Sequence, residues 1–306
     1  MAPKEPSRLV PVLLVVVVLV VAGVGAGLVY YFNHKSSGSS RLTIHLGDNA
    51  TVNYIGFFGS GPQQGRVFDT SFYSVATNNV TYPKSLEYSM RPNASSYTPL
   101  AVHVGPNAPQ SGYPLNGLSF IEVVTGFWQG LIGMPGNQTT SIVVPPALGY
   151  GAASPSCFEN ASLSFTVPVV VTLTTAQFSS TYPGQTAAQG AQFPDPTYGW
   201  PVYVVSANST RVVVQNQPTI GWSAKTGGWQ VEVTALNSTT ITLVNELNPS
   251  QAGLVSGTSS ASVCGQTSFI VSAVSLATGT YTRDYNTEVK GQTLIFQVTV
   301  VGIFPQ

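Results

Sequence analysis

The chain has 306 residues, and its 11 Lys and Arg balance its 11 Asp and Glu, so the formal net charge is zero. Only 7% of residues are charged, whereas an average soluble protein has about 25%. This composition argues against nucleic-acid binding, which needs a basic surface, and the apolar fraction of 43% argues against charge-driven disorder. Thirty Gly and 22 Pro, with abundant Thr, Ser and Val, favour strands and turns over helices. Glycans or an acidic habitat would each account for so few charges, and both remain open.

The first predicted element is a transmembrane helix over residues 9–32. This run of 24 residues is apolar and uncharged, which is long enough to span a hydrocarbon core of about 30 Å. We interpret residues 1–8 as a cytoplasmic tail and residues 33–41, rich in Ser, as a flexible linker. Small residues between 22 and 27 leave cleavage as a signal peptide open as an alternative.

The orientation of this span does not follow from charge, because Lys4 and Arg8 precede it and Lys35 and Arg41 follow it. Seven Asn-x-Ser/Thr glycosylation sequons all lie after the span, at Asn49, Asn79, Asn93, Asn137, Asn160, Asn208 and Asn237. Both cysteines, Cys157 and Cys264, also follow it, which fits one disulfide in an oxidising compartment, although two unpaired buried thiols are the alternative. We therefore predict a single-pass protein of the cell membrane whose bulk is extracytoplasmic.

The next part of the chain predicts strands with one helical turn. Residues 42–52 alternate apolar and polar residues and indicate a strand, with a turn at Gly47 and Asp48. Residues 70–98 are loop-like, and residues 100–104, 141–144 and 293–304 indicate further strands. Residues 126–134 predict a short helix with Phe127, Leu131 and Met134 on one face.

Residues beyond Ser154 predict a weak internal repeat of three hairpins. The hairpins turn at Asn208, at Asn237 and near Thr278, and each unit ends a few residues later at a glycine: Gly221, Gly253 and Gly291. A disulfide between Cys157 and Cys264 would close a loop of over 100 residues and fix both ends of this repeat region. The pattern therefore suggests an inserted domain whose two ends lie close together.

Six segments carry a family resemblance, and they occur in the family's order. They are Gly47-Asp48 with 52–56 (VNYIG), 65–71 (GRVFDTS), 99–105 (PLAVHVG), 123–134 (VVTGFWQGLIGM), 144–151 (VPPALGYG) and 291–298 (GQTLIFQV). Together these segments resemble the FKBP family of peptidyl-prolyl isomerases, including its G-x-x-F-D-S-S signature and its Ala-Tyr-Gly element. The repeat region stands where the SlyD-like subgroup carries its insert-in-flap domain, although it is longer than usual and Thr287 replaces the subgroup's usual His.

The resemblance implies an α+β, mainly β fold in which an antiparallel sheet wraps a short helix. The isomerase domain would comprise residues 42–155 plus 285–306, and the inserted β-rich domain would comprise residues 156–284. Carried over by position, the catalytic residues would be Tyr54, Phe68, Asp69, Tyr150 and Phe296, and the substrate-binding residues would be Leu100, Val123, Val124 and Phe127. Leu100 and Phe127 stand where the family often has an aromatic residue and Trp, so this pocket wall is apolar but less aromatic.

The implied activity is peptidyl-prolyl cis-trans isomerisation, and with it a role as folding helper for exported proteins. An apolar pocket favours the twisted amide, so the reaction needs no nucleophile, metal or other cofactor. The three histidines are scattered, and His103 on a strand is best explained as structural. The expected partners are proline-containing unfolded or exported polypeptides and, through the N-terminal helix, the membrane.

Two other functions remain open. The chain could be an FKBP-like binding module without catalysis, or a β-rich cell-surface adhesion protein. The insert, which contains Trp200, Trp222 and Trp229, would by resemblance bind unfolded segments and deliver them to the pocket, or else it only stabilises the chain.

Overall fold

The computed structural model describes residues 42–106, 114–115 and 118–306. This part is mainly β, with antiparallel sheets and three short α-helices, α2 (Tyr73–Thr77), α3 (Thr125–Leu131) and α4 (Thr175–Thr181), as the composition predicts. None of the helices in the described ranges is long and apolar enough to cross a membrane. The predicted span at 9–32, its tail and its linker lie outside the described residues.

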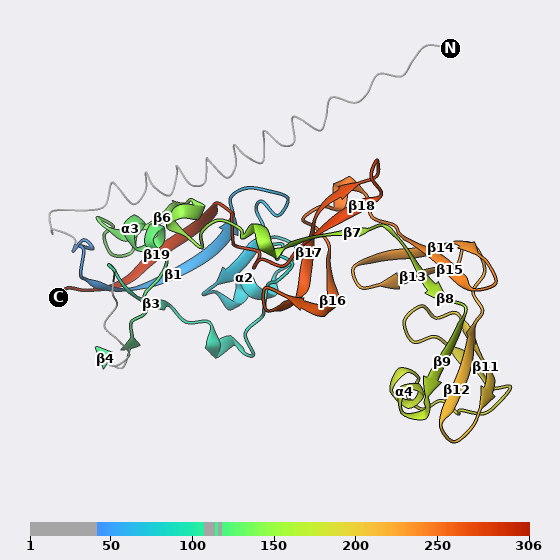
Figure 1. Ribbon diagram of the computed structural model, residues 1–306. Coiled ribbons are helices and arrows are strands. Elements are labelled where there is room, and N and C mark those ends of the chain that lie inside the picture. Colours follow the sequence, from blue (N-terminus) through green and yellow to red (C-terminus); the bar gives the residue numbers. More distant parts are fainter. Residues whose placement is uncertain (1–41, 107–113, 116–117) are drawn as a thin grey trace, which may run out of the picture. The chain divides into compact units, whose positions relative to one another are not determined.

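One five-stranded antiparallel sheet, which we name the body sheet, contains both the start and the end of the described chain. Its order is β2 (Val67–Thr70), β1 (Asn49–Phe58), β19 (Leu294–Phe304) and β6 (Thr139–Val144), and β3 (Leu100–His103) pairs with the first half of β1. Figure 1 shows β1 in blue beside β19 in red, and their register runs from Asn49 opposite Phe304 to Phe58 opposite Leu294. A two-stranded hairpin, β4 (Pro114–Leu115) and β5 (Leu118–Ser119), lies between β3 and α3 in the chain. The sheet is therefore closed by residues that lie 236 to 255 positions apart in the chain.

The first strand begins later than the alternation predicts. Residues 42–48 form no continuous strand, because Gly47 adopts a φ of 95° and turns the chain before Asn49. The N–H of Gly47 donates to the carbonyl of Val104 at 2.8 Å, and the N–H of Ile44 donates to that of Met134 at 3.0 Å. Ile44 is thus buried by a turn that folds onto the body rather than by a sheet. The strands predicted over 100–104, 141–144 and 293–304 are confirmed as β3, β6 and β19.

The predicted helical turn is confirmed as α3, whose buried face includes Phe127 and Leu131. The helix packs directly on β6, and two glycines one turn apart make this possible. A Cβ on Gly126 would lie 2.9 Å from Val144, and one on Gly130 would lie 2.4 Å from Ile142. Positions i and i+4 share one face of a helix, so this pair presents bare backbone to the sheet. This close approach holds Phe127 against the sheet.

The repeat region forms three separate four-stranded antiparallel sheets, which we number in chain order. The first insert sheet contains β10 (Gln192–Pro194), β11 (Pro201–Ala207), β12 (Arg211–Asn216) and β9 (Val170–Thr174). The second contains β13 (Ser223–Thr226), β14 (Trp229–Leu236), β15 (Thr240–Asn245) and β8 (Ser164–Pro168). The third contains β16 (Ser256–Val263), β17 (Gln266–Ser275), β18 (Thr280–Asp284) and β7 (Phe158–Ser162). Short 3-10 turns, η1 (Ala94–Ser96), η2 (Pro146–Leu148), η3 (Pro155–Cys157) and η4 (Pro249–Gln251), complete the elements.

The fourth strand of each sheet comes from one outgoing segment, residues 157–174, which Figure 1 shows running through β7, β8 and β9. Its pairing repeats every six residues. The carbonyls of Cys157, Leu163 and Val169 accept hydrogen bonds at 2.8–2.9 Å from the N–H groups that end the three hairpins, those of Tyr285, Asn245 and Asn216. Along the chain, the outgoing segment therefore pairs with the third sheet first, through β7, and with the first sheet last, through β9. The turn residues predicted the three hairpins, but no sequence pattern predicted that one segment would pair with all three sheets.

The repeat has a different phase from the predicted one. Three glycines with positive φ, Gly190, Gly221 and Gly253, occupy matching positions in the three sheets. Their N–H groups donate to the carbonyls of Val204, Val233 and Val271 at 2.9, 2.8 and 2.6 Å, and each of these acceptors lies next to a β-bulge. Each unit therefore begins at a glycine. Gly291, which we expected to end the third unit, instead donates to the carbonyl of Gly151 at 2.8 Å, where the chain returns to the body.

The first and second insert sheets each contain a buried tryptophan that is hydrogen-bonded to a buried asparagine. The indole N–H of Trp200 donates to Asn216 Oδ1 at 3.1 Å, and that of Trp229 donates to Asn245 Oδ1 at 2.8 Å. Each asparagine then donates to a carbonyl of the outgoing segment at 3.0 Å. The third sheet has the buried ring of Tyr285 at the position of the asparagine. Buried side chains of all three sheets form one hydrophobic cluster, separate from that of the body.

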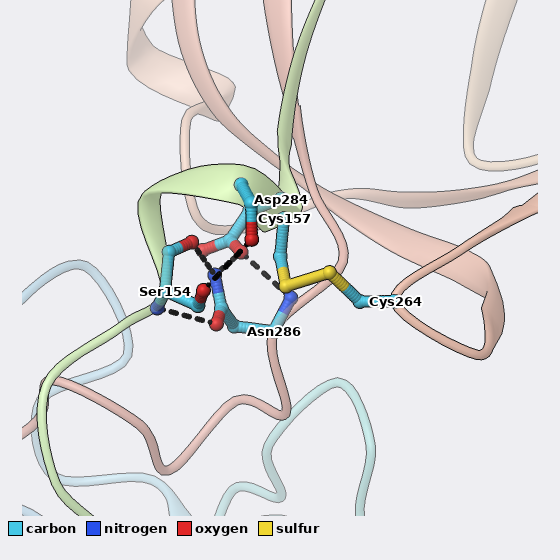
Figure 2. The surroundings of a disulfide bond; sticks show 6 residues. Ser154, Cys157, Cys264, Asp284 and Asn286 are labelled. Atoms are coloured by element: carbon cyan, nitrogen blue, oxygen red, sulfur yellow. Dashed lines mark hydrogen bonds between the residues drawn. A yellow bond between two sulfur atoms is a disulfide. The ribbon is translucent and has the colours of Figure 1, made fainter.

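The disulfide between Cys157 and Cys264 is confirmed, with Cα atoms 5.7 Å apart (Figure 2). It does not fix both ends of the repeat region as expected, because Cys264 lies at the β16–β17 turn inside the third unit. The ends are held by Asn286, whose Oδ1 accepts from the N–H of Ser154 at 2.8 Å and whose amide also donates to Asp284 (Figure 2). We name this place, where the chain leaves the body near Ser154 and returns near Asn286, the crossing. The predicted domain boundaries at 155 and 284 fall in the crossing and stay predictions.

Six of the seven sequon asparagines are exposed, and Asn49 is not. The Asn49 residue is 1% exposed because it starts β1 inside the body, where its Oδ1 lies 3.0 Å from Nδ1 of the buried His103. The folded chain therefore buries this asparagine, and glycosylation at each of the seven sequons stays a prediction. Asn208 and Asn237 occupy hairpin tips in matching turns, and the Oδ1 atom of each accepts two backbone N–H groups at 2.8–2.9 Å.

Candidate active site

Four of the predicted aromatic residues form one cluster, which we name the ring cluster: Tyr54, Phe68, Phe127 and Phe296. The ring of Phe296 stands edge-on to that of Phe127, with centroids 4.8 Å apart, and to that of Phe68, with centroids 5.5 Å apart. Tyr54 is edge-on to Phe127 at 6.3 Å. These geometries are the favoured ones for aromatic pairs. Strands β1, β2 and β19 and helix α3 each contribute one ring, so only the closed body sheet brings them together.

A polar network lies at the edge of the ring cluster. The hydroxyl of Tyr54 donates to Asp69 Oδ2, and Asp69 Oδ1 accepts from the Arg91 guanidinium at 2.9 Å and from the N–H of Thr70 at 2.8 Å. Burial and the neighbouring Asp69 carboxylate raise the pKa of Tyr54, so the hydroxyl stays protonated at neutral pH. The Asp69 side chain is nearly half exposed. The arrangement is therefore a half-exposed carboxylate held in a fixed orientation above apolar rings.

Arg91 is the residue of this site that sequence reasoning missed. Its guanidinium also donates to the Tyr54 hydroxyl at 3.2 Å and lies 5.0 Å over the ring of Tyr97. Its backbone N–H donates to the Tyr97 hydroxyl at 2.8 Å, and η1 between them is capped by Asn93. One signal was available, because Arg91 is one of few charged residues within the loop-like residues 70–98.

The remaining predicted residues lie at the partly accessible side of the body. Leu100, Val123 and Val124 are half-buried and pack against the body core. Val124 caps α3, and its N–H makes no hydrogen bond to another residue of the described part. The Tyr150 residue, after η2, is 46% exposed, and burial together with the charge of Asp69 raises the pKa of its hydroxyl. The N–H of Val124 and the hydroxyl of Tyr150 are thus hydrogen-bond donors without a partner in the described part of the chain.

The inner rings are closely packed, and three cavities of the described residues lie elsewhere. Tyr54, Phe127 and Phe296 are buried. Cavities of about 600, 310 and 290 Å³ lie in the insert, at the crossing near Gly291 and beside Phe72. A solvent-filled prolyl pocket therefore stays a prediction, and the accessible part of the candidate site is the edge formed by Asp69, Tyr150 and the half-buried Val124.

The comparison with known families points to the same part of the chain. Residues 117–170 match the family of FKBP-type peptidyl-prolyl cis-trans isomerases. The matched segment holds α3, β6 and the first strands of the outgoing segment, and with them Val123, Val124, Phe127 and Tyr150. The other site residues lie outside the matched segment, on strands that the body sheet places beside it: Tyr54, Phe68, Asp69 and Phe296. The chain matches none of the curated proteins.

Within residues 42–106, 114–115 and 118–306, no three His, Cys, Asp or Glu side chains gather as ligands would. The chemistry that the arrangement supports comes from apolar rings, one fixed carboxylate and hydrogen-bond donors.

Proposed function

We propose that this protein is a peptidyl-prolyl cis-trans isomerase that acts on proline-containing segments of unfolded, exported polypeptides. The single observation that carries the proposal is the ring cluster bordered by the Tyr54–Asp69–Arg91 network. The match of residues 117–170 to the FKBP-type isomerases also supports it, because the matched segment supplies Phe127 of the ring cluster together with Val124 and Tyr150.

The reaction requires no covalent step. Rotation about a peptide bond faces a barrier of about 18–20 kcal/mol because resonance gives the C–N bond double-bond character. The planar amide is the more polar state and is well solvated by water, whereas the twisted amide has lost that resonance. An apolar surface of aromatic rings therefore destabilises the planar state relative to the twisted one.

In this proposal the polar groups of the site hold the substrate chain while the bond turns. The N–H of Val124 and the hydroxyl of Tyr150 donate to substrate carbonyls on either side of the proline. Asp69, fixed by Tyr54 and Arg91, faces the carbonyl carbon of the twisting amide. Because Tyr54 and Arg91 both point at Asp69, they act as positioning residues for it.

The proposed location is the outer side of a membrane, to which residues 9–32 anchor the chain. The disulfide between Cys157 and Cys264 supports an oxidising compartment. The six exposed sequons are compatible with glycosylation there. Release of the chain by proteolysis at the span and recovery of glycosylated peptides by mass spectrometry would test both points.

The activity is tested with the full chain in mild detergent, on a short proline peptide whose cis fraction is followed by exchange NMR. We expect wild type to accelerate the exchange. Asp69→Asn, which keeps the shape and removes the charge, should slow it about ten-fold, since hydrogen bonds to a charged group contribute about 1.5–3 kcal/mol. Tyr203→Phe on β11, far from the site in the chain, is the matched control and should leave the rate unchanged.

The other two functions give different results in this assay. A binding module without catalysis would broaden or shift the peptide signals without changing the exchange rate. An adhesion protein would do neither. Acceleration by wild type that survives Asp69→Asn in full would mean that the reaction occurs at another site.

A further inference from the structure

A long connection of the body carries Arg91, the residue that orients Asp69. It comprises residues 71–99, between β2 and β3, and we name it the body loop. Its middle is fixed at the sheet, because the N–H of Ser85 donates to the carbonyl of Val67 at 3.0 Å. The residues between Ser85 and Arg91 pair with no strand of the described chain. Other contacts must therefore set the course of the loop toward Arg91.

Two side chains from outside the body loop hold the residues that follow this fixed point. The Gln63 side chain accepts through Oε1 from the N–H of Leu86 at 2.9 Å. Glu288 Oε2 accepts from the N–H of Glu87 at 3.1 Å and from the Gln63 amide at 3.4 Å. Glu288 Oε1 accepts from the hydroxyl of the buried Ser85 at 2.5 Å. The Glu288 carboxylate thus joins three donors, two of which belong to the body loop.

Glu288 is itself held on both sides along the chain. Before it lies the crossing, where Asn286 Oδ1 accepts from the N–H of Ser154 at 2.8 Å. After it comes Val289, whose side chain packs on the body core. Its own N–H donates to a carboxylate oxygen of Glu87 at 3.1 Å, so Glu87 and Glu288 bind each other reciprocally. Hydrogen bonds to a carboxylate are stronger than those between neutral groups, which makes Glu288 a firm anchor for the loop.

Arg91 has a second anchor on its other side. Its backbone N–H donates to the Tyr97 hydroxyl at 2.8 Å, and its guanidinium donates to the carbonyl of Ser96 at 3.3 Å. These bonds fix Arg91 against η1, whereas Glu288 fixes the chain four residues before it. The guanidinium reaches Asp69 Oδ1 at 2.9 Å, and such a bond weakens steeply when its distance or angle changes. The contact with Asp69 therefore depends on both anchors.

We propose that Glu288 is a positioning residue whose carboxylate fixes the body loop so that Arg91 meets Asp69. In the described part of the chain this carboxylate forms no ion pair, so its hydrogen bonds to the loop are its main contacts. Its effect on isomerisation rests on the proposed function, whereas its effect on the Arg91–Asp69 contact does not. The segment that returns from the insert then helps to organise the candidate active site.

The first test measures the Arg91 contact directly, in the full chain with ¹⁵N-labelled arginine in mild detergent. The side-chain N–H signal of Arg91 is assigned with Arg91→Met, which keeps the stem and removes the guanidinium. We expect Glu288→Ala to move this signal in the same direction as Asp69→Asn, because both changes weaken one charged hydrogen bond. Lys290→Ala, at an exposed position of the same turn, is the control and should leave the signal in place.

The second test measures the exchange rate of the short proline peptide. Glu288→Ala should slow exchange about three- to ten-fold at saturating peptide and leave peptide affinity unchanged, since a change within a contact network alters a connected site by this amount. Glu288→Gln keeps the volume and one acceptor oxygen, so its effect should be smaller, and Lys290→Ala should have none. In the Arg91→Met background, Glu288→Ala should slow exchange no further, because no guanidinium remains to be placed.

The two tests also separate this proposal from the proposed function. An Arg91 signal that stays in place in both Glu288→Ala and Glu288→Gln would overturn the proposal. Equal slowing by Glu288→Ala with and without Arg91→Met would overturn it as well, because a merely structural role acts alike in both backgrounds. If wild type shows no isomerisation while Glu288→Ala still moves the signal, the enzyme proposal fails and the placement of Arg91 by Glu288 stands. If isomerisation is normal and Glu288→Ala changes neither readout, the positioning role fails alone.

Discussion

The body and the insert are both β-rich, but they are assembled in opposite ways. In the body, β1 pairs with β19 across almost the whole described chain, and each ring of the ring cluster comes from a different element. In the insert, each sheet is a local hairpin extended by one neighbouring strand and by the outgoing segment. The body therefore gains a single site from distant residues, whereas the insert repeats one unit and varies it at a turn.

This difference tells where each kind of function can arise. A site made from four elements tolerates little change in any of them, and the close contacts of Gly126 and Gly130 with β6 illustrate this. A repeated unit can change one turn without disturbing the other units. The turns between β10 and β11, between β13 and β14, and between β16 and β17 differ in this way, and they carry Tyr198, Gly227 and Cys264 respectively. We expect perturbations of the insert to stay local and those of the body to reach the candidate active site.

The largest expected effect separates the two regions directly. Replacing both Cys157 and Cys264 by Ala opens a loop spanning 107 positions, for which chain entropy gives a destabilisation of about 4–5 kcal/mol. Urea unfolding followed by tryptophan fluorescence reports mainly the insert, which contains three of the four tryptophans. The exchange rate of the short proline peptide, which is the readout of the proposed isomerase activity, reports the body at the same urea concentrations.

We expect the insert transition to move to lower urea while the body transition keeps its midpoint. Ser156→Ala, beside the disulfide, serves as control and should leave both transitions in place. If both midpoints fell together, the two regions would unfold as one unit and the comparison above would be wrong.

An intermediate effect tests whether the insert is a true repeat. Asn216→Ala and Asn245→Ala each remove the acceptor of a buried indole N–H and the donor to a carbonyl of the outgoing segment. We expect each to destabilise the insert by about 2 kcal/mol, the cost of leaving buried polar groups unpaired. Thr234→Ala on the exposed side of β14 should change stability by less than about 0.5 kcal/mol. Costs that differ by more than about 1 kcal/mol would show that the two units are not equivalent.

The smallest effect concerns the body near its crossing with the insert. Partial burial of its carboxyl raises the pKa of Glu87, although the residue as a whole is exposed, and the nearby charges of Glu288 and Asp284 raise it further. A carboxyl whose pKa is higher in the folded state stabilises the fold below its unfolded pKa of about 4.3, and this contribution is lost as pH rises. Glu87→Gln should therefore raise the melting temperature at pH 7 by up to about 2 °C and leave it unchanged at pH 3.5.

Glu122→Gln, at another exposed carboxylate of the body, is the control for Glu87. A Glu87→Gln effect of the same size at both pH values would mean that the change acts through packing rather than through charge. A decrease at pH 7 would mean that the hydrogen bond between Glu87 and the N–H of Glu288 outweighs the charge repulsion.

Much of this molecule was predictable because its signals are local. Short apolar stretches predicted β3, β6 and β19, the apolar face of Phe127, Leu131 and Met134 predicted α3, and turn residues predicted the three hairpins. The aromatic residues of the site were found through their motifs, and the two cysteines through their number. In each case a short stretch of sequence carries both the pattern and the element that it forms.

What only the tertiary structure decided depends on contacts between distant segments. Arg91 reaches Asp69 because a loop folds back over β2, and Asn49 is buried because β1 lies inside the body. The outgoing segment divides itself among three sheets, and the buried side chains of these sheets meet in one hydrophobic cluster. Sequence patterns fix which face of an element is apolar, but which partner covers that face is decided when the chain closes. For this protein, closure placed the carboxylate against its arginine and joined three similar sheets around one core.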